Sequence, residues 1–160
     1  MLGELADTIL LVTADQARDE AEGLRVVSDL RPGAGPLGGL YTAIVAASPA
    51  RVLVVACDMP FLTAPFLRHL VAGATGVDAV VPRTADGYHP LCGVYAPSAA
   101  EPLRRRIESG RLKVIDALAD LKVREIGPEE IARYDPDGRL FFNVNTPDDY
   151  RRALRLPART

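Results

Sequence analysis

The stretch from Arg51 to Leu62, RVLVVACDMPFL, constrains the fold more than any other part of this sequence. Its first half is apolar and rich in valine, a pattern typical of a strand that is buried on both faces of a parallel sheet. The run then reaches a single carboxylate, Asp58, and Pro60 prevents the strand from continuing. We therefore expect a buried strand that ends in one acidic side chain.

The segments on either side of this strand alternate between strand-like and helix-like patterns. The expected strands are residues 8–12, 24–28, 52–56, 78–82 and 121–126, and an extended piece covers residues 88–96. The expected helices are residues 37–47, 64–72 and 97–109, with a final helix after the NTPDD motif at residues 145–149. This order predicts one α/β domain, residues 1–160, with three layers and a mostly parallel sheet.

Composition and charge narrow the classes of partner. The 160 residues carry 19 Lys and Arg against 21 Asp and Glu, so a formal net charge of -2 offers no bulk attraction for nucleic acid or an anionic membrane. No apolar run has the length of a membrane span, and the first residues lack the features of an export signal. Cys57 and Cys92 lie in apolar runs without metal-ligand spacing, so we interpret both as small core residues of a cytoplasmic protein.

The loop at residues 28–39, SDLRPGAGPLGG, follows an expected strand and precedes an expected helix. Ligands of α/β sheets bind at the carboxyl ends of strands, so Asp29 and the glycines of this loop could hold a base or a sugar. An ordinary strand-to-helix connection has the same composition. The loop matches neither the dinucleotide fingerprint nor the Walker motif. The residues alone leave both interpretations open.

Asp58 also has two interpretations. A carboxylate at the end of a strand is a plausible ligand for Mg²⁺, which proteins hold with one or two carboxylates plus phosphates and waters. Alternatively, the side chain caps the following helix or a turn near Phe61. Nothing in the neighbouring residues separates the two.

Several other charged residues have simpler interpretations. We expect His69 to be a surface or half-buried histidine, because no second histidine or carboxylate lies at ligand spacing on its helix. The run Arg104 to Arg106 is typical of a solvated helix face. Arg111 and Lys113 could bind a phosphate, but a solvated surface position is the favoured interpretation.

Five stretches of the chain, taken together, resemble one family. VVSDLRPGAGPLGGL, VLVVACDMPFL, YHPLCGVY, ESGRLKV and FFNVNTPDDY, in this order, are similar to the molybdenum cofactor guanylyltransferases and, more widely, to the MobA-like nucleotidyltransferases. The resemblance runs from about Thr8 to the end of the chain. It implies a Rossmann-like nucleotidyltransferase fold that transfers GMP from GTP to a molybdopterin-type cofactor, with Mg²⁺ and release of pyrophosphate.

The same resemblance implies roles for individual residues. Asp58 falls at the position of the magnesium ligand and is the implied catalytic residue. On the nucleotide side, the implied residues are Thr13, Asp29, Gly35, Pro36, Leu37 and Asp58 itself. Thr13 stands where the family often has asparagine. On the pterin side, the implied residues are His89, Pro90, Asn143 and Asn145.

The chain departs from the family at its amino-terminal end. The family's glycine-rich signature, of the type LAGGxSxRMGxDK, has no counterpart here, so we expect an N-terminally truncated domain without the first strand and the triphosphate loop. Loss of a central strand would leave its neighbours as edges, which predicts self-association or a partner chain. Two alternatives to the guanylyltransferase stay open: a molybdopterin cytidylyltransferase, and a catalytically inactive binding or partner protein.

Overall fold

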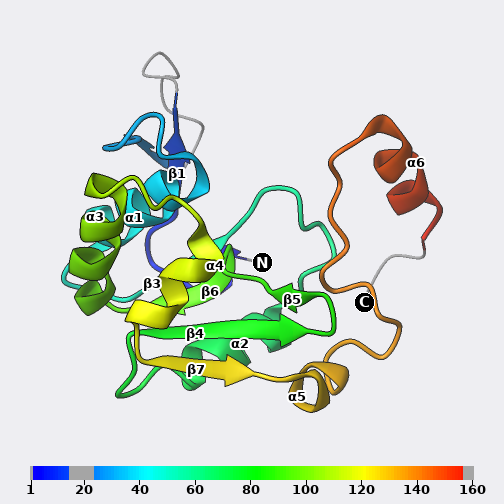
Figure 1. Cartoon of the computed structure of the whole chain (residues 1–160). Helices are drawn as coiled ribbons and strands as arrows, with labels where there is room; N and C mark the ends of the chain where they lie inside the picture. The colour runs from blue at the N-terminus through cyan, green and yellow to red at the C-terminus, as the bar shows by residue number, and fades with distance from the viewer. Residues whose placement is uncertain (1, 15–23, 157–160) are drawn as a thin grey trace.

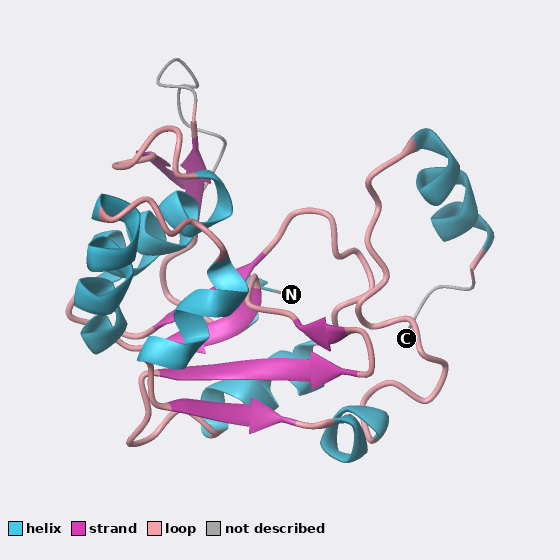
Figure 2. Ribbon diagram, viewed as in Figure 1, coloured by secondary structure: helices cyan, strands magenta, loops and turns pink. Residues whose placement is uncertain are grey.

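The computed structural model describes residues 2–14 and 24–156, and within these ranges the strands form two separate sheets (Figures 1 and 2). In the smaller sheet, β1 (Leu10–Thr13) pairs in parallel with β2 (Arg25–Ser28). The larger sheet contains β3 (Val52–Val55), β6 (Cys92–Tyr95), β4 (Ala79–Thr84) and β5 (Gly87–Tyr88) in that order, and β7 (Val123–Ile126) also pairs with β4.

The α/β class is confirmed, but the sheet is mixed rather than mostly parallel. Strands β3, β4 and β7 run in one direction, because β3 and β4 are both antiparallel to β6 and β7 is parallel to β4. The extended piece expected at residues 88–96 supplies β5 and β6, and β6 lies between β3 and β4. The connection from β4 through β5 to β6 is too short for the crossover that a parallel pair needs, and β6 therefore pairs antiparallel with β4.

The helices lie largely where the sequence predicts them. They are α1 (Gly35–Ala47), α2 (Ala64–Ala72), α3 (Ala100–Glu108), α4 (Val114–Ala117), α5 (Pro128–Ala132) and α6 (Pro147–Arg155), with 3-10 turns η1 (Leu2–Glu4), η2 (Pro97–Ala99) and η3 (Leu118–Asp120). The short helices α4 and α5 were not predicted. Across the described residues, no helix has the length and apolar character needed to cross a membrane.

The larger sheet separates two hydrophobic clusters, which gives the predicted three layers (Figure 2). In β4, Ala79 and Val81 point to the cluster under α1, α3 and α4, whereas Val80 points to the cluster under α2 and α5. The alternation follows from the two-residue period of a strand. Both faces of β4 are therefore covered, and Val80 and Val81 are fully buried.

Strand β3 differs from its prediction, because its residues are only half-buried. Alternate side chains of β3 do face the two clusters, but among the described residues its only strand partner is β6. Helix α1 packs against β1, β2 and β3, so the two sheets lie against one helix without a hydrogen-bonded pair between them in the described ranges. The valine-rich run is thus an edge of the larger sheet rather than its centre.

The structure tests the predictions that the two cysteines are core residues and that His69 is a surface or half-buried residue. Cys92 is buried as expected, and burial raises the pKa of its thiol to about 12. Cys57 is exposed, so the expectation of a core residue is wrong there, because the strand ends before it. His69 is half-buried and lies 2.8 Å from a carboxylate oxygen of Glu130, which agrees with a structural role.

Candidate active site

The carboxylate of Asp29 shapes the loop that follows β2. Its Oδ1 accepts hydrogen bonds from the Arg31 amide and from the Thr42 hydroxyl, each at 2.9 Å. Thr42 is completely buried on α1, and its hydroxyl oxygen also accepts a bond from the Leu30 amide. The Asp29 amide donates to the Thr13 carbonyl at 2.9 Å. The structure therefore brings Thr13 and Asp29 together at the adjacent carboxyl ends of β1 and β2.

The start of α1 closes tightly on the same loop. A Cβ at Gly38 would lie 2.8 Å from the Arg31 carbonyl oxygen, so only glycine lets the helix approach the loop this closely. Gly35 opens the helix at a φ of +59°, and Pro36 occupies the first turn. The side chain of Leu37 is fully buried in the core, so only its main chain could make the predicted nucleotide contact.

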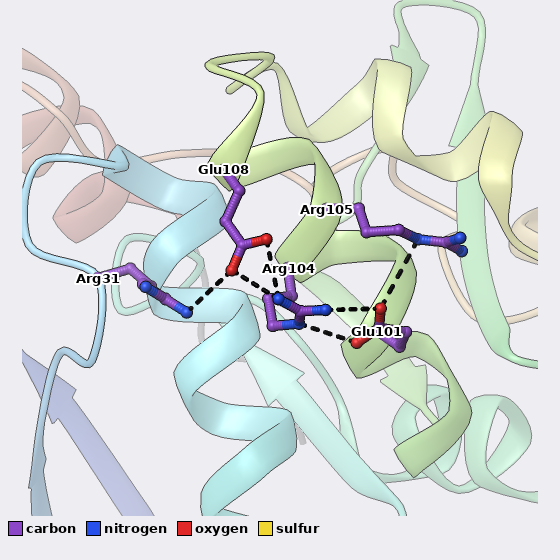
Figure 3. Close-up of polar contacts among 5 residues, drawn as sticks. All are labelled: Arg31, Glu101, Arg104, Arg105 and Glu108. Carbon is purple, nitrogen blue, oxygen red and sulfur yellow. Dashed lines mark hydrogen bonds and ion pairs between the residues drawn. The ribbon is translucent and has the colours of Figure 1, made fainter.

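An ion-pair network ties this loop to α3, as Figure 3 shows. Arg31 lies 3.5 Å from Glu108, which also pairs with Arg104 at 2.6 Å. Arg104 and Arg105 both reach Glu101, and the two carboxylates raise the pKa of the Arg104 guanidinium. These groups are largely exposed, and ion pairs in water contribute little to stability, so the network adds little to the stability of the fold.

The third arginine of the run contradicts the prediction of a solvated face. Arg106 is only 8% exposed, and its Nε lies 2.6 Å from a carboxylate oxygen of Asp120 in η3. The reason is helical geometry: Arg106 lies three positions after buried Leu103, on the side of α3 that faces the core.

Asp58 lies in the turn that follows β3, and one of its carboxylate oxygens is buried without a partner. Within the described residues, Oδ1 of Asp58 is the one buried side-chain nitrogen or oxygen that makes no hydrogen bond. An unpaired buried acceptor costs about 1–3 kcal/mol, so such an atom calls for an explanation. The helix-cap interpretation is wrong, because α2 begins at Ala64 after Thr63 as its N-cap residue.

The donor set around Asp58 fits a magnesium site of one particular kind. Among the residues that the structure describes, no group of three or more His, Cys, Asp or Glu side chains could hold a metal ion by itself. A hard cation bound here would therefore depend on one carboxylate plus oxygens from phosphate and water, which is the usual way that Mg²⁺ is held. The unpartnered Oδ1 of Asp58 has the chemistry for that contact.

A cavity of about 620 Å³ is lined in part by Met59, the chain neighbour of Asp58, and gathers several of the predicted residues. Its walls are formed by Pro36, Met59, Tyr88, His89, Pro90, Leu91, Lys113, Val114, Ile115, Asp116 and Asn143. Pro36 belongs to the predicted nucleotide side, whereas His89, Pro90 and Asn143 belong to the predicted pterin side. Met59, the neighbour of Asp58, lines the cavity between them. A ligand of moderate size would fit in this space.

The ring of His89 is fixed in the cavity wall. It stacks on Phe141, with ring centroids 4.1 Å apart and an angle of 17° between the planes. Its Nε2 lies 3.0 Å from the Thr84 hydroxyl. Burial lowers the pKa of His89, and the nearby carboxylate of Asp86 opposes this shift. The imidazole is therefore kept neutral more readily than a free histidine and can present either a donor or an acceptor to a ligand.

The NVNTP stretch divides into two parts with different roles. Asn143 lines the cavity. Asn145 is exposed and does not line the larger cavity. Its main-chain amide donates to the Asp149 carboxylate at the start of α6. Thr146 and Asp149 form a capping box there. The sequence placed both asparagines on the pterin side, and of the two only Asn143 lines the larger cavity.

The sequence underrated Lys113 and missed Tyr88 and Asp116, all of which line the cavity. A phosphate contact was one interpretation of Lys113, which lies in the ESGRLKV stretch, but a solvated surface position was favoured. The unpredicted helix α4 begins at the next residue and brings this segment to the cavity. A smaller cavity, of about 380 Å³, lies beside the loop at residues 30–34 and is closed by residues 107–112 at the end of α3.

Comparison with known proteins gives a consistent family. Residues 1–123 match the family described as MobA-like NTP transferase domain. A probable molybdenum cofactor guanylyltransferase of Pelotomaculum thermopropionicum is 37% identical over 82% of this chain and 64% of its own length. One from Chloroflexus aggregans is 34% identical over 94% of this chain and 74% of its own length. This chain thus spans about two thirds to three quarters of these relatives.

A solved structure adds the same comparison in three dimensions. The molybdopterin-guanine dinucleotide biosynthesis protein A of Archaeoglobus fulgidus superimposes with a TM-score of 0.78 at 34% sequence identity. The superposition covers 90% of this chain and 75% of the other. The mixed sheet and its flanking helices are therefore those of a nucleotidyltransferase fold.

Proposed function

Because this chain belongs to the MobA-like NTP transferase family, we propose that it is a nucleotidyltransferase domain of molybdenum cofactor biosynthesis that transfers GMP from GTP to a molybdopterin-type cofactor. In this reaction an oxygen of the cofactor's phosphate forms a bond to the α-phosphorus of GTP. The bond between the α-phosphorus and the bridging oxygen breaks, and pyrophosphate leaves with the electron pair. The proposal includes a cytoplasmic location, where GTP is available.

The observation that carries this proposal is the unpartnered buried oxygen of Asp58, the residue that directly precedes Met59 in the wall of the larger cavity. Asp58 would hold Mg²⁺ through this oxygen, with phosphate and water oxygens as the other ligands. The bound ion would supply charge neutralisation of the phosphate groups. Asp58 thereby orients the reacting phosphate group against the second substrate, since catalysis of this transfer depends chiefly on positioning and electrostatics.

The cavity residues support a second substrate with a polar ring and a phosphate. Asn143 offers both a donor and an acceptor for the edge of a pterin, and His89, whose Nε2 lies 3.0 Å from the Thr84 hydroxyl, offers its other ring nitrogen. Lys113 is an exposed cation in the same wall, suited to a phosphate. On the nucleotide side, Thr13 contributes a hydroxyl and Asp29 an acceptor for a base or a ribose.

The direct test is a calorimetric titration of the protein with GTP and with CTP, each with Mg²⁺ present. We expect GTP to bind and CTP to bind about tenfold more weakly or worse, since polar groups matched to guanine stay unpaired against cytosine. Tighter binding of CTP would favour the cytidylyltransferase alternative. Absence of binding to either nucleotide, in a protein that still binds a molybdopterin-type cofactor, would favour the non-catalytic binding protein.

Two open sheet edges support a further part of this proposal, that the chain associates with itself or with a partner strand. Among the described residues, β1 pairs only with β2, and β3 pairs only with β6, so each strand has one edge without a strand partner. Unpaired strand edges are templates for further pairing. We expect sedimentation velocity to show mass increasing with protein concentration. A monomer at every concentration, with one cooperative thermal transition, would contradict this expectation.

A further inference from the structure

The segment from Arg139 to Thr146, which we call the strap, connects α5 to α6 and runs past the carboxyl end of the larger sheet (Figure 1). Aromatic contacts anchor its middle. Phe141 packs edge-on against Phe66 of α2, with centroids 5.6 Å apart, and Phe142 packs edge-on against Phe61 at 5.9 Å. Leu140, just before them, is completely buried. The strap is therefore fixed on the body of the domain although it is neither helix nor strand.

One hydrogen bond connects the strap to the candidate metal ligand. The Val144 amide donates to the main-chain carbonyl of Asp58 at 2.8 Å. The neighbouring Asn143 lines the larger cavity. This bond holds Asp58 through its main chain and does not involve Oδ1, which has no hydrogen-bond partner.

Of the aromatic residues that anchor the strap, Phe141 also contacts the wall of the larger cavity, through His89. One face of its ring is stacked on His89, and its edge meets Phe66 in the core. A flat ring satisfies both contacts, whereas a branched aliphatic side chain of similar hydrophobicity would keep the burial but lose the parallel stack. The shape of Phe141, and not only its apolar character, thus sets where the strap lies.

We infer that Phe141 is a positioning residue for the active site: by stacking on His89 it fixes the strap, and the strap fixes Asp58 and Asn143 through the Val144 amide. This inference rests on the proposed function, in which Asp58 holds the metal. Phe141 itself touches neither metal nor substrate. Its effect passes through the main chain of Asp58, much as outer-shell partners orient the ligands in other metal sites.

The test compares Phe141→Leu, which removes the ring, with Phe141→Tyr, which keeps it. The probe is Mn²⁺ together with GTP, because the single Asp58 carboxylate needs phosphate oxygens to complete the site, and binding of Mn²⁺ to the protein is followed by electron paramagnetic resonance. We expect Phe141→Leu to weaken Mn²⁺ binding about tenfold, in line with the loss of an outer-shell partner, and Phe141→Tyr to stay within about twofold of the parent. If the parent binds Mn²⁺ and Phe141→Leu binds it equally well, the inference is wrong.

A second readout needs no metal and separates this inference from the proposed function. Hydrogen exchange at the Val144 amide, measured by NMR, should accelerate about tenfold or more in Phe141→Leu but not in Phe141→Tyr. Unchanged protection at Val144 would overturn the inference even if the metal site is real. Failure of the parent to bind Mn²⁺ in the presence of GTP would instead reject the proposed metal site, and Val144 exchange would then decide the positioning role alone.

His89→Ala provides the same test from the other side of the stack, should Phe141→Leu fold poorly. His89 is only half-buried, so its truncation disturbs the core less than a change at Phe141. We expect His89→Ala to accelerate Val144 exchange as Phe141→Leu does, and His89→Phe, which restores a stacked ring, to return it to the parent's rate. Equal exchange in His89→Ala and the parent would contradict the inference.

Discussion

Replacing Asp58 with asparagine should weaken Mg²⁺-dependent GTP binding and lower nucleotidyl transfer by about 100-fold or more. Asparagine keeps the size of the side chain but removes the charge that would hold the cation, and removing even an outer-shell partner of a metal site typically costs about 10–100-fold. Calorimetric titration of GTP with Mg²⁺ measures the first effect, and release of pyrophosphate measures the second. Equal binding by variant and parent would remove Asp58 from the magnesium role.

A matched control and a stability measurement sharpen this prediction. Glu129→Gln removes an exposed carboxylate on α5, away from both cavities, and should leave nucleotide binding unchanged. In the absence of metal, Asp58→Asn should not lower the melting temperature, because Oδ1 of Asp58 makes no hydrogen bond that the substitution could break. Loss of binding without loss of stability is the expected signature of a site residue; a marked fall in melting temperature would indicate a structural one.

Replacing Phe66 with alanine should destabilise the domain by about 3–5 kcal/mol, the usual cost of truncating a fully buried phenylalanine. The Phe66 side chain is 0% exposed and packs edge-on against Tyr134 after α5 and Phe141 in the strap. The substitution therefore opens a cavity where three segments meet. Urea denaturation of the parent and the variant measures the difference.

The control for Phe66→Ala lies on the same helix. Val71 is 46% exposed on α2, so Val71→Ala should change the free energy of unfolding by no more than about 0.5 kcal/mol. A cost below about 1.5 kcal/mol for Phe66→Ala would mean that the surrounding side chains relax into the space, and that α2 and the strap are less firmly joined than their contacts indicate.

The fold could be predicted from the sequence to the extent that its elements are local. Apolar runs identify β1, β3 and β4, and the alternation of these runs with helical segments identifies the α/β class. The order of strands in the sheet could not be predicted in the same way. Strand β6 inserts between β3 and β4, so the valine-rich run became an edge and the pairing became mixed. Pairing depends on which distant segments meet, which no local pattern records.

The candidate site shows the same division. Asp58, His89 and Asn143 were predicted from motifs. In the structure, His89 and Asn143 line the larger cavity together with Met59, the chain neighbour of Asp58. Lys113 was interpreted as a solvated residue although it lies in the ESGRLKV stretch, because its place in the cavity wall depends on the turn into α4. Asn145 matched a motif but lies at the capping box of α6. Residue type indicated the chemistry, and the fold selected which residues share a cavity.

By itself, the sequence determined that the carboxylate of Asp58 follows a strand, and that a glycine-rich loop follows an earlier strand, because apolar periods, glycine and proline act on their own stretch of chain. Only the tertiary structure decided that one oxygen of this carboxylate is buried without a partner, and that the Val144 amide holds its main chain. Both facts depend on segments far apart in the chain, which come together only when the sheet and its helices pack. The opening run therefore contains a buried polar atom to which the rest of the fold gives no hydrogen-bond partner.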